Sequence, residues 1–291
     1  MPEPVPQEEP GPATPRRAGV RVRVRREPML AASLLMLALL ASVAAVPQAF
    51  TSGDPRACDL ARSRETPSLA HPFGFDTLGC DYLVQTVYGA RTSLSVAGLT
   101  LVATVVVALV LGGMAGYRGG WADVLVSRAA DAWAAIPLLL GGVVVLTATE
   151  RRGVLEVSLV LAIFGWPAMV RLVRGSVRTA ASRDHVLAAR ALGAGPWRIL
   201  RRHVLPNSVR PLLVYASAFA GVVVAAEATL TYIGTGLQQP TESWGLMLLR
   251  SQDRITQAPH LMVFPALALV FTVLAFVLLG EALRRRSPPD A

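Results

Sequence analysis

Lysine is absent from this 291-residue sequence, and all 28 basic residues are arginine. A coding bias toward arginine explains such an absence, but it still has a chemical consequence. The phosphate-binding loop of P-loop ATPases requires a lysine that reaches the nucleotide phosphates. The chain therefore cannot carry that loop. We expect it to bind no ATP, Mg²⁺ or other cofactor, and any coupled ATP hydrolysis to occur on partner subunits.

Charged residues of either sign are also scarce. They make up 16% of the chain against 53% hydrophobic residues, and the mean hydropathy is +0.48. This composition excludes an ordinary soluble domain and is typical of a polytopic membrane protein. The net charge of +9 does not indicate a nucleic-acid partner, because the arginines flank apolar runs, as a lipid bilayer requires.

Histidines are few and scattered. No nucleophile–base arrangement accompanies them, so an enzyme is not favoured. His71 lies beside Asp76 and Asp81, where a structural role is favoured over a metal site, so no metal site is expected. The four histidines are His71, His185, His203 and His260.

Long uncharged runs indicate helices that cross a membrane. About 20 residues of helix span roughly 30 Å of hydrocarbon, and four charge-free runs contain 18 or more residues. A fifth run is interrupted only by Glu227. A sixth has only 14 residues and contains Gly165-Trp166-Pro167, so a re-entrant segment is its alternative interpretation. The six runs are residues 29–46, 92–117, 132–149, 157–170, 211–233 and 261–280.

The distribution of arginine favours six spans over five. With six spans and the amino terminus inside, 19 arginines fall on the inner side and 8 on the outer side, and Arg128 lies near the start of the third span. Without the run 157–170, the nine arginines between positions 171 and 210 would lie outside, against the positive-inside rule. We therefore predict an all-α polytopic membrane protein with six transmembrane helices and both termini in the cytoplasm.

The first hydrophobic run follows a basic segment, as in a cleavable signal peptide, but it exceeds the usual length of about 7–15 residues, which favours a retained anchor.

Both cysteines, Cys58 and Cys80, fall on the oxidising side, so a disulfide is expected, with two unrelated buried thiols as the alternative. The expected organisation is a disordered basic cytoplasmic tail at 1–28, a first transmembrane helix at 29–50, an extracytoplasmic loop at 51–90, a core transmembrane domain at 91–283 and a cytoplasmic tail at 284–291.

The inner segment between the fourth and fifth spans has an ordered pattern of small and apolar residues. Ser182 suits the start of a helix over residues 183–192, and Gly193 suits the carboxyl end of that helix, in the left-handed region. Gly195-Pro196 then begins a second helix, which Leu205-Pro206 ends before the fifth span. A solvated loop or a lipid-binding segment would tolerate any order of these residues. The pattern therefore predicts a protruding helical hairpin that docks on another protein.

This segment resembles the EAA loop of ABC importer permeases, whose pattern is Glu-Ala-Ala, three residues, Gly, nine residues, an apolar residue, any residue, then Leu-Pro. The matching residues are Ala188, Ala189, Gly193, Leu205 and Pro206. Leu187 stands where the pattern has Glu, and His203 stands where it has an apolar residue. Asp184, one helical turn before Leu187, is the candidate replacement for the missing acid.

Further segments resemble the dipeptide, oligopeptide and nickel branch of that family. They are His203–Asn207, His71–Gly74, Leu78–Asp81, Tyr88–Arg91, Gly116–Trp121, Ala226–Ala228, Gly234–Gly236 and Ser243–Gly245. Cys80, where the family usually has Arg, departs from the pattern. Together the matches cover roughly residues 71 to 283 and point to the second, C-type, of two non-identical permease subunits.

The resemblance implies a MetI-like transmembrane domain in the bacterial plasma membrane, forming half of a pore with a second homologous permease. It also implies two P-loop ATPase subunits, an extracytoplasmic solute-binding protein, and peptides as substrates, with nickel or another small solute as the alternative. The coupling loop, at about 173–210, is then expected to contact an ATPase. Its expected contact residues are Asp184, Leu187, Ala188, Ala189, Arg190, Gly193, His203, Leu205 and Pro206.

Three charged residues within or beside the predicted spans are further candidates. Arg128 and Asp131 lie three residues apart on one helical face and are expected to pair. Glu227 has no local partner in the sequence, and a structural role is favoured over a pathway role for all three residues. A stand-alone channel or secondary transporter is the rival interpretation. It requires more intramembrane ionisable groups and an internal repeat, neither of which is apparent.

Overall fold

The fold comes from a computed structural model that describes residues 28–286. The expected amino-terminal tail at 1–28 lies outside the described residues except for Pro28, and the expected tail at 284–291 lies outside them beyond Arg286. The described part of the chain is helical, with no strand beyond two isolated β-bridges. Its long helices are α1 (Pro28–Ala45), α2 (Tyr82–Val107), α6 (Val154–Ala181), α9 (Leu205–Tyr232) and α11 (His260–Arg285).

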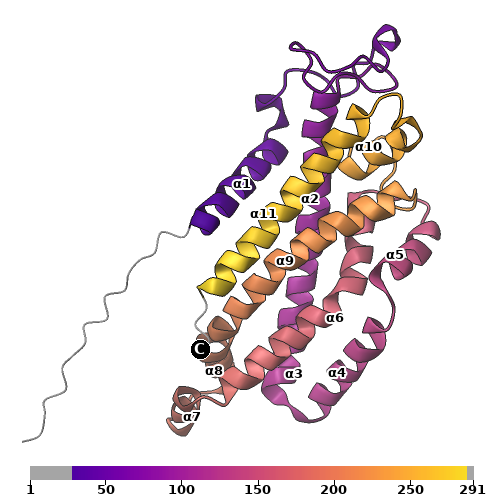
Figure 1. Ribbon diagram of the computed structural model, residues 1–291. Helices are drawn as coiled ribbons and strands as arrows, with labels where there is room; N and C mark the ends of the chain where they lie inside the picture. The colour runs from indigo at the N-terminus through magenta and orange to yellow at the C-terminus, as the bar shows by residue number, and fades with distance from the viewer. Residues whose placement is uncertain (1–27, 287–291) are drawn as a thin grey trace, which may run out of the picture.

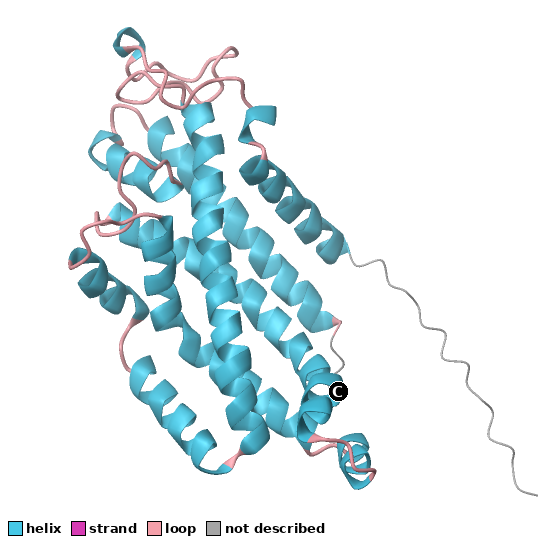
Figure 2. Cartoon of the chain, turned by 180° about the vertical axis from the view of Figure 1, so that it is seen from behind, coloured by secondary structure: helices cyan, strands magenta, loops and turns pink. Residues whose placement is uncertain are grey.

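Shorter elements connect these long helices. They are η1 (Pro47–Ala49), η2 (Leu60–Arg62), η3 (Ala108–Gly112), α3 (Gly113–Arg118), α4 (Gly120–Ala134), α5 (Leu138–Thr147), α7 (Asp184–Ala191), α8 (Pro196–Ile199), η4 (Leu200–Val204), α10 (Trp244–Ser251) and η5 (Gln252–Arg254). The long helices run roughly side by side (Figures 1 and 2). The segment 46–81 and α10 lie at one end of the molecule, called the loop end below, and residues 182–204 lie at the other, called the hairpin end.

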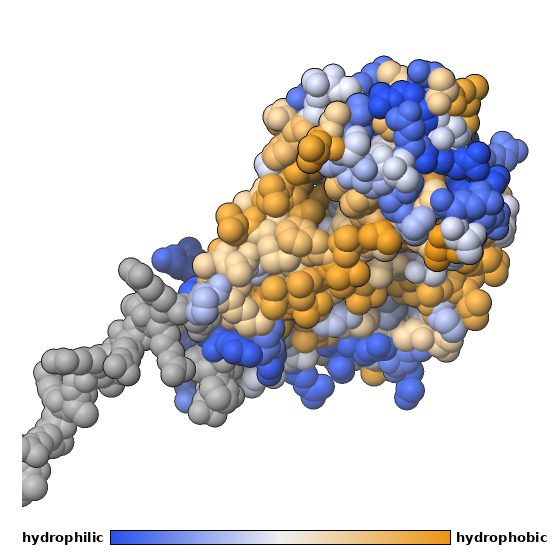
Figure 3. Space-filling view, turned by 45° about the horizontal axis from the view of Figure 1, so that its top comes forward, coloured by the Kyte–Doolittle hydropathy of each residue, from blue (hydrophilic) through white to orange (hydrophobic). Residues whose placement is uncertain are grey.

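Six membrane crossings are present, as the sequence predicts. Five helices are long and apolar enough to cross a membrane, and the pair α4–α5, bent by 78°, supplies the sixth. The short run 157–170 is the middle of α6, which has 28 residues. Exposed apolar side chains form a belt between two polar ends (Figure 3), which is the pattern expected of a surface in contact with lipid.

Several predicted boundaries are wrong. The third span, predicted as continuous over 132–149, is broken between α4 and α5, because Pro137 disfavours helical backbone at the residue before it. The loop predicted to reach residue 90 ends at Asp81, whose carboxylate accepts hydrogen bonds from the first N–H groups of α2 and so caps that helix. The first span ends at Ala45 rather than at residue 50, and α11 continues past residue 283 to Arg285.

Pro167 lies inside α6 without ending it, because a neighbouring helix satisfies the carbonyl that this proline leaves unpaired. A proline lacks the N–H that would bond the carbonyl four residues earlier, which here belongs to Ile163. Trp133 of α4 donates a hydrogen bond from its indole Nε1 to that carbonyl, at 2.6 Å. An unpaired carbonyl is costly in hydrocarbon, so this bond both preserves α6 and fixes α4 against it.

Pro265 in α11 is compensated in the same way. The carbonyl of Leu261, four residues earlier, accepts a hydrogen bond from the Tyr82 hydroxyl at the start of α2. Tyr82→Phe should therefore destabilise the protein by about 1–3 kcal/mol, the usual range for leaving a buried polar group unpaired. The melting temperature of the purified protein measures this effect. Tyr88→Phe is the matched control, since the Tyr88 hydroxyl makes no hydrogen bond within residues 28–286; equal losses in both variants would contradict this interpretation.

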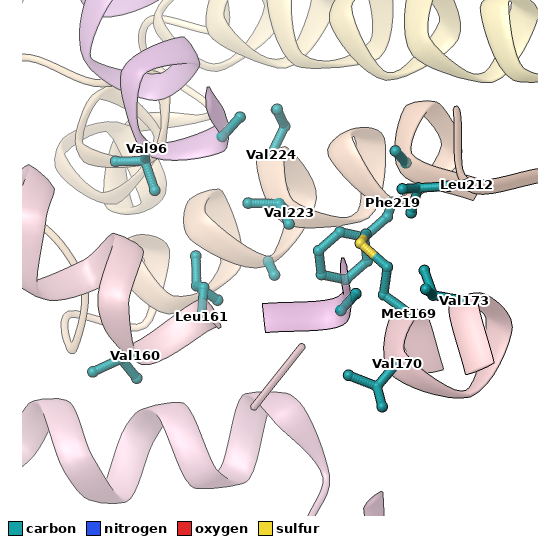
Figure 4. Close-up of a cluster of buried hydrophobic side chains, with 14 of the residues drawn as sticks. Val96, Val160, Leu161, Met169, Val170, Val173, Leu212, Phe219, Val223 and Val224 are labelled. Atoms are coloured by element: carbon teal, nitrogen blue, oxygen red, sulfur yellow. The ribbon is translucent and has the colours of Figure 1, made fainter. Parts of the chain in front are cut away.

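The hydrophobic core lies where α2, α6 and α9 meet. Its buried side chains include Val96 of α2, Leu161 and Met169 of α6, and Phe219 and Val223 of α9 (Figure 4). Because these side chains come from three different crossings, the core joins those crossings into one body.

Two glycines allow η3 and α3 to approach α6 closely. A Cβ atom on Gly112 would lie 2.7 Å from the carbonyl oxygen of Val170, and one on Gly116 would lie 2.6 Å from the carbonyl oxygen of Arg174. Small residues spaced four apart commonly let the backbones of transmembrane helices touch. Any larger side chain at these two positions must push the helices apart.

The segment 46–81 is held mainly by covalent and polar contacts rather than by regular structure. A disulfide joins Cys58 to Cys80, the pair expected from the sequence. The Asp76 carboxylate accepts hydrogen bonds from the backbone N–H groups of Leu78 and Cys80, both at 2.8 Å. These contacts hold the segment at the loop end, over the start of α2.

Candidate functional site: the hairpin and the cleft beside it

The hairpin at residues 183–204 has a first arm close to the predicted one, but Ser182 does not cap it. The Ser182 hydroxyl instead donates a hydrogen bond to the carbonyl of Thr179 at the end of α6, and Arg183 is the residue before α7. Helix α7 occupies Asp184–Ala191, and Gly193 follows with a φ of +81°. The N–H of Gly193 bonds the carbonyl of Arg190, and the N–H of Ala194 bonds the carbonyl of Ala189. This pair of bonds is the Schellman arrangement, which needs a residue with positive φ at the position of Gly193. The direction of the turn therefore depends on this glycine.

The second arm differs from the prediction. Leu205-Pro206 does not end the helix that starts at Pro196, because α8, η4 and α9 form one helix over Pro196–Tyr232. The turn just before Pro206, η4, is a π-helix. A widened turn there gives the proline ring room beside the carbonyl of Arg202, four residues earlier. The second arm of the hairpin and the fifth crossing are thus one continuous helix.

Burial divides the hairpin into a base and a tip. Val186, Ile199 and Val204 are each at most 1% exposed and belong to the main core. At the tip, Leu192 is 88% exposed and Trp197 is 66% exposed. A well-anchored base therefore holds two large apolar side chains away from the rest of the chain.

The other predicted contact residues are distributed along both arms, with His203, Leu205 and Pro206 next to the base residue Val204. On α7, Asp184, Leu187, Ala188 and Arg190 are exposed and Ala189 is half-buried; on the second arm, His203 and Leu205 are half-buried and Pro206 is exposed. The His185 and His203 rings lie 6.2 Å apart between centroids, across the two arms. Asp184 makes no ion pair within the described residues, so the replacement of the missing Glu by Asp184 stays a prediction.

A cleft of about 840 Å³ lies beside the hairpin, between α6 and α9, with Arg284 of α11 at its edge. A second cavity of about 340 Å³ adjoins it deeper in the span. The two share Arg171, Tyr215 and Ala218 in their linings. The second cavity also reaches the break between α4 and α5. The two hollows therefore follow one another along α9, from Asn207 near the hairpin to Val222.

The cleft residues were not singled out in the sequence. Arg183, Arg210 and Tyr215 line the cleft, but the two arginines are part of a segment whose charge already accounts for membrane orientation. Arg210, Val214 and Ala218 are spaced four residues apart and therefore lie on one face of α9. This spacing was the signal in the sequence from which the cleft wall could have been found. Only the packing of α6 against α9 shows that this face borders a cavity.

The predicted pair Arg128–Asp131 does not form. The Asp131 carboxylate instead lies 3.5 Å from Nη1 of Arg171, on α6. Residues three apart on a helix can pair, but this interaction is weak at an exposed position, and Asp131 is 57% exposed. The pair with Arg171 places Asp131 near the opening of the second cavity.

Glu227 has partners that the sequence does not reveal. It is fully buried in α9, and its carboxylate accepts hydrogen bonds from the hydroxyls of Ser93 in α2 and Thr231 in α9. Each hydroxyl in turn accepts a backbone N–H, from Trp244 and Leu237 respectively. The carboxylate thus connects two crossings to the segment 234–244 at the loop end, which fits the structural role favoured from the sequence.

Glu227→Leu should destabilise the protein, because it leaves two buried hydroxyls without their acceptor, at about 1–3 kcal/mol for each unsatisfied group. Glu227→Gln keeps one acceptor oxygen and should lose less. Thermal unfolding of both purified variants shows which of them loses more stability. A melting temperature for Glu227→Leu equal to that of the wild type would show that this network does not hold the loop end.

Comparison with known proteins places the chain in a family. Residues 108–290 match the family model described as "Binding-protein-dependent transport system inner membrane component". The glutathione transport system permease protein GsiD of Pectobacterium atrosepticum is 36% identical over 276 residues, which cover 95% of this chain and 91% of the relative. GsiD of Escherichia coli is 36% identical over 268 residues, which cover 92% of this chain and 88% of the relative.

Among solved structures, a chain from an inward-facing conformation of the MetNI methionine ABC transporter is similar in fold. The TM-score is 0.57 at 20% identity, and the match covers 70% of this chain and 97% of that chain. The six-crossing all-α architecture is therefore confirmed as MetI-like. The chain belongs to the family of binding-protein-dependent transport system inner membrane components and is a multi-pass permease of the ABC importer type.

Proposed function

We propose that this permease forms half of an import pore for short peptides, with a second homologous permease as the other half. The peptide assignment is supported by the GsiD relatives, which match over nearly the whole chain and carry glutathione, a tripeptide, in their name. A solute-binding protein on the loop-end side delivers the substrate. Two P-loop ATPase subunits hydrolyse ATP on the other side, and this chain itself binds no nucleotide.

The hairpin carries the coupling part of the proposal. Its two large apolar tip residues, Leu192 and Trp197, are exposed although the base beneath them is buried in the core. Exposed apolar groups on a rigid support are typical of a protein contact surface. Each ATPase subunit would hold one permease hairpin in this way, so that closure of the ATPases displaces the hairpins and rearranges the crossings. Of the predicted contact residues, Leu187, Ala188 and Arg190 of α7 are exposed on the arm that leads to this tip.

This proposal fixes the orientation of the chain. The hairpin end and both termini lie in the cytoplasm, and the disulfide-bonded loop end lies outside. The large excess of arginine in the segments predicted to be inside supports this arrangement.

Cysteine labelling and cross-linking test both parts. Leu192→Cys should react with a membrane-impermeant maleimide only after the cells are permeabilised, and a short bifunctional reagent should cross-link it to a co-expressed ATPase subunit. Leu69→Cys, an equally exposed leucine at the loop end, is the control and should react in intact cells without cross-linking. Labelling of Leu192→Cys in intact cells, or cross-linking of the control alone, would overturn the proposal.

A further inference from the structure

The charged residues that line the cleft between α6 and α9 are all basic. Among the described residues that line it are four arginines, and no aspartate or glutamate. They come from three helices and from the residue that starts the hairpin: Arg171, Arg183, Arg210 and Arg284. Arg183 is half-buried and the other three are exposed, but all four border a single hollow of about 840 Å³.

Two of these charges are compensated and two are not. Arg171 lies 3.5 Å from Asp131, and Arg284 bonds both carboxylate oxygens of Glu281 at 2.7 and 2.8 Å. The side chains of Arg183 and Arg210 have no ion pair or hydrogen bond within residues 28–286. Because both arginines line the same cleft, an anion bound there would be attracted by two cations that have no partner among the described residues.

The remaining lining indicates what kind of anion fits. Ser176, Thr179, Asn207 and Tyr215 add hydroxyl and amide groups, and the other six lining residues are apolar or glycine. Guanidinium groups bind carboxylates in charge-assisted hydrogen bonds, and the neutral polar groups can bond the amides of a short peptide. The volume is within the usual range for small-molecule sites, about 300–1,000 Å³.

The location of the cleft favours a transported solute over a lipid headgroup. The adjoining 340 Å³ cavity shares part of its lining and leads along α9 toward the middle of the span. A phosphate headgroup needs only the charged residues near the hairpin end, whereas Tyr215 adds a hydroxyl that lines both hollows.

We propose that this cleft is a subsite on the transport route that holds the carboxylate of a departing solute, with Arg183 and Arg210 as its ligands. The importer therefore prefers solutes with a free carboxylate at this step. Arg183 is also the residue that precedes α7, so the bound solute contacts the start of the coupling hairpin. This inference rests on the proposed import function.

Equilibrium binding to the complete, nucleotide-free complex in phosphatidylcholine nanodiscs tests the inference. The probes are radiolabelled glutathione, which has free carboxylates, and glutathione diethyl ester, which has none. The wild type should bind glutathione at least about tenfold more tightly than the ester, and Arg183→Gln and Arg210→Gln should each remove about tenfold of that affinity, the scale of one charge-assisted hydrogen bond. Binding of the ester should stay unchanged.

Arg118→Gln is the matched control, because Arg118 is exposed at the turn between α3 and α4, outside the cleft, and carries the same charge. It should bind both probes as the wild type does. Glutathione affinity that is unchanged in the Arg183→Gln/Arg210→Gln double variant would overturn the inference. So would phosphatidylglycerol that co-purifies with the wild type and is lost from the double variant while glutathione binding is unaffected, since the cleft would then be a lipid site.

A separate measurement distinguishes failure of the inference from failure of the proposed function. If ATPase subunits co-purify with the permease and hydrolyse ATP under control of the binding protein, the import function stands. Glutathione binding that does not depend on the arginines then overturns only the carboxylate subsite. If no ATPase co-purifies with the wild type, the proposed function itself fails.

Discussion

Gly193→Val should abolish the stimulation of ATP hydrolysis by the binding protein while leaving the permease inserted in the membrane. Gly193 has a φ of +81°, where a residue with a Cβ costs about 1–2 kcal/mol and a β-branched residue more. The space around it is open, so the penalty comes from the backbone and not from a clash. Valine would unwind the Schellman turn and change the angle between the two hairpin arms. Substrate-stimulated ATPase activity of the reconstituted complex measures the result.

The chain contains a close control for this substitution. Gly195, two residues later, has a φ of −64°, and a Cβ on it would also meet nothing within 4 Å. Gly195→Val adds the same side chain to the same tip without requiring positive φ, so it should retain most of the coupled activity. Unchanged coupling in a correctly assembled Gly193→Val complex would count against the hairpin as the mechanical connection. Equal loss of coupled activity in both variants would mean that the added side-chain volume at the tip, rather than the backbone angle at Gly193, causes the loss.

Gly112→Ala should destabilise the protein although it adds only one methyl group. The new Cβ would lie 2.7 Å from the carbonyl oxygen of Val170 and 3.1 Å from the backbone nitrogen of Arg174, so two helix backbones must separate. Overpacking of this kind typically costs about 1–3 kcal/mol. The melting temperature of the purified permease in detergent should fall accordingly.

Gly113→Ala separates this packing effect from helix propensity. Gly113 is the next residue, has nearly the same helical backbone angles, and a Cβ on it would meet nothing within 4 Å. Alanine favours helix over glycine by about 0.8–1 kcal/mol at either site. Gly113→Ala should therefore leave the melting temperature unchanged or raise it. A fall of similar size in both variants would mean that the close approach to α6 is not what limits stability.

The fold could be predicted from the sequence where the pattern lies in neighbouring residues or adds up along a long segment. Hydrophobic length and arginine placement led to six crossings, and the order of small residues led to the α7 turn at Gly193. Pro137 also indicates the break between α4 and α5 locally. The uncharged apolar residues around it nevertheless led to the prediction of one continuous span. By contrast, Pro167 looked like an interruption of the fourth crossing. It is tolerated because Trp133, on another helix, satisfies the carbonyl of Ile163.

The candidate site was predictable only in part, for the same reason. The hairpin is a continuous piece of chain, so its pattern can be recognised in one dimension. The cleft is assembled from three helices, and nothing local distinguishes Arg183 and Arg210 from the arginines that only orient the chain. Likewise, the partners of Glu227 and Asp131 come from other helices. Sequence spacing along one helix led to the wrong partner for Asp131.

The absence of a break between α8 and α9 has a mechanical consequence. The helix Pro196–Tyr232 has 37 residues, which at about 1.5 Å per residue gives a length of about 55 Å. Side chains from Ile199 near its start to Leu230 near its end belong to the main core. A helix that packs along most of its length and has no hinge moves as one piece. We therefore expect a displacement of the hairpin at Trp197 to be carried through the core to Tyr232, at the other end of the crossing.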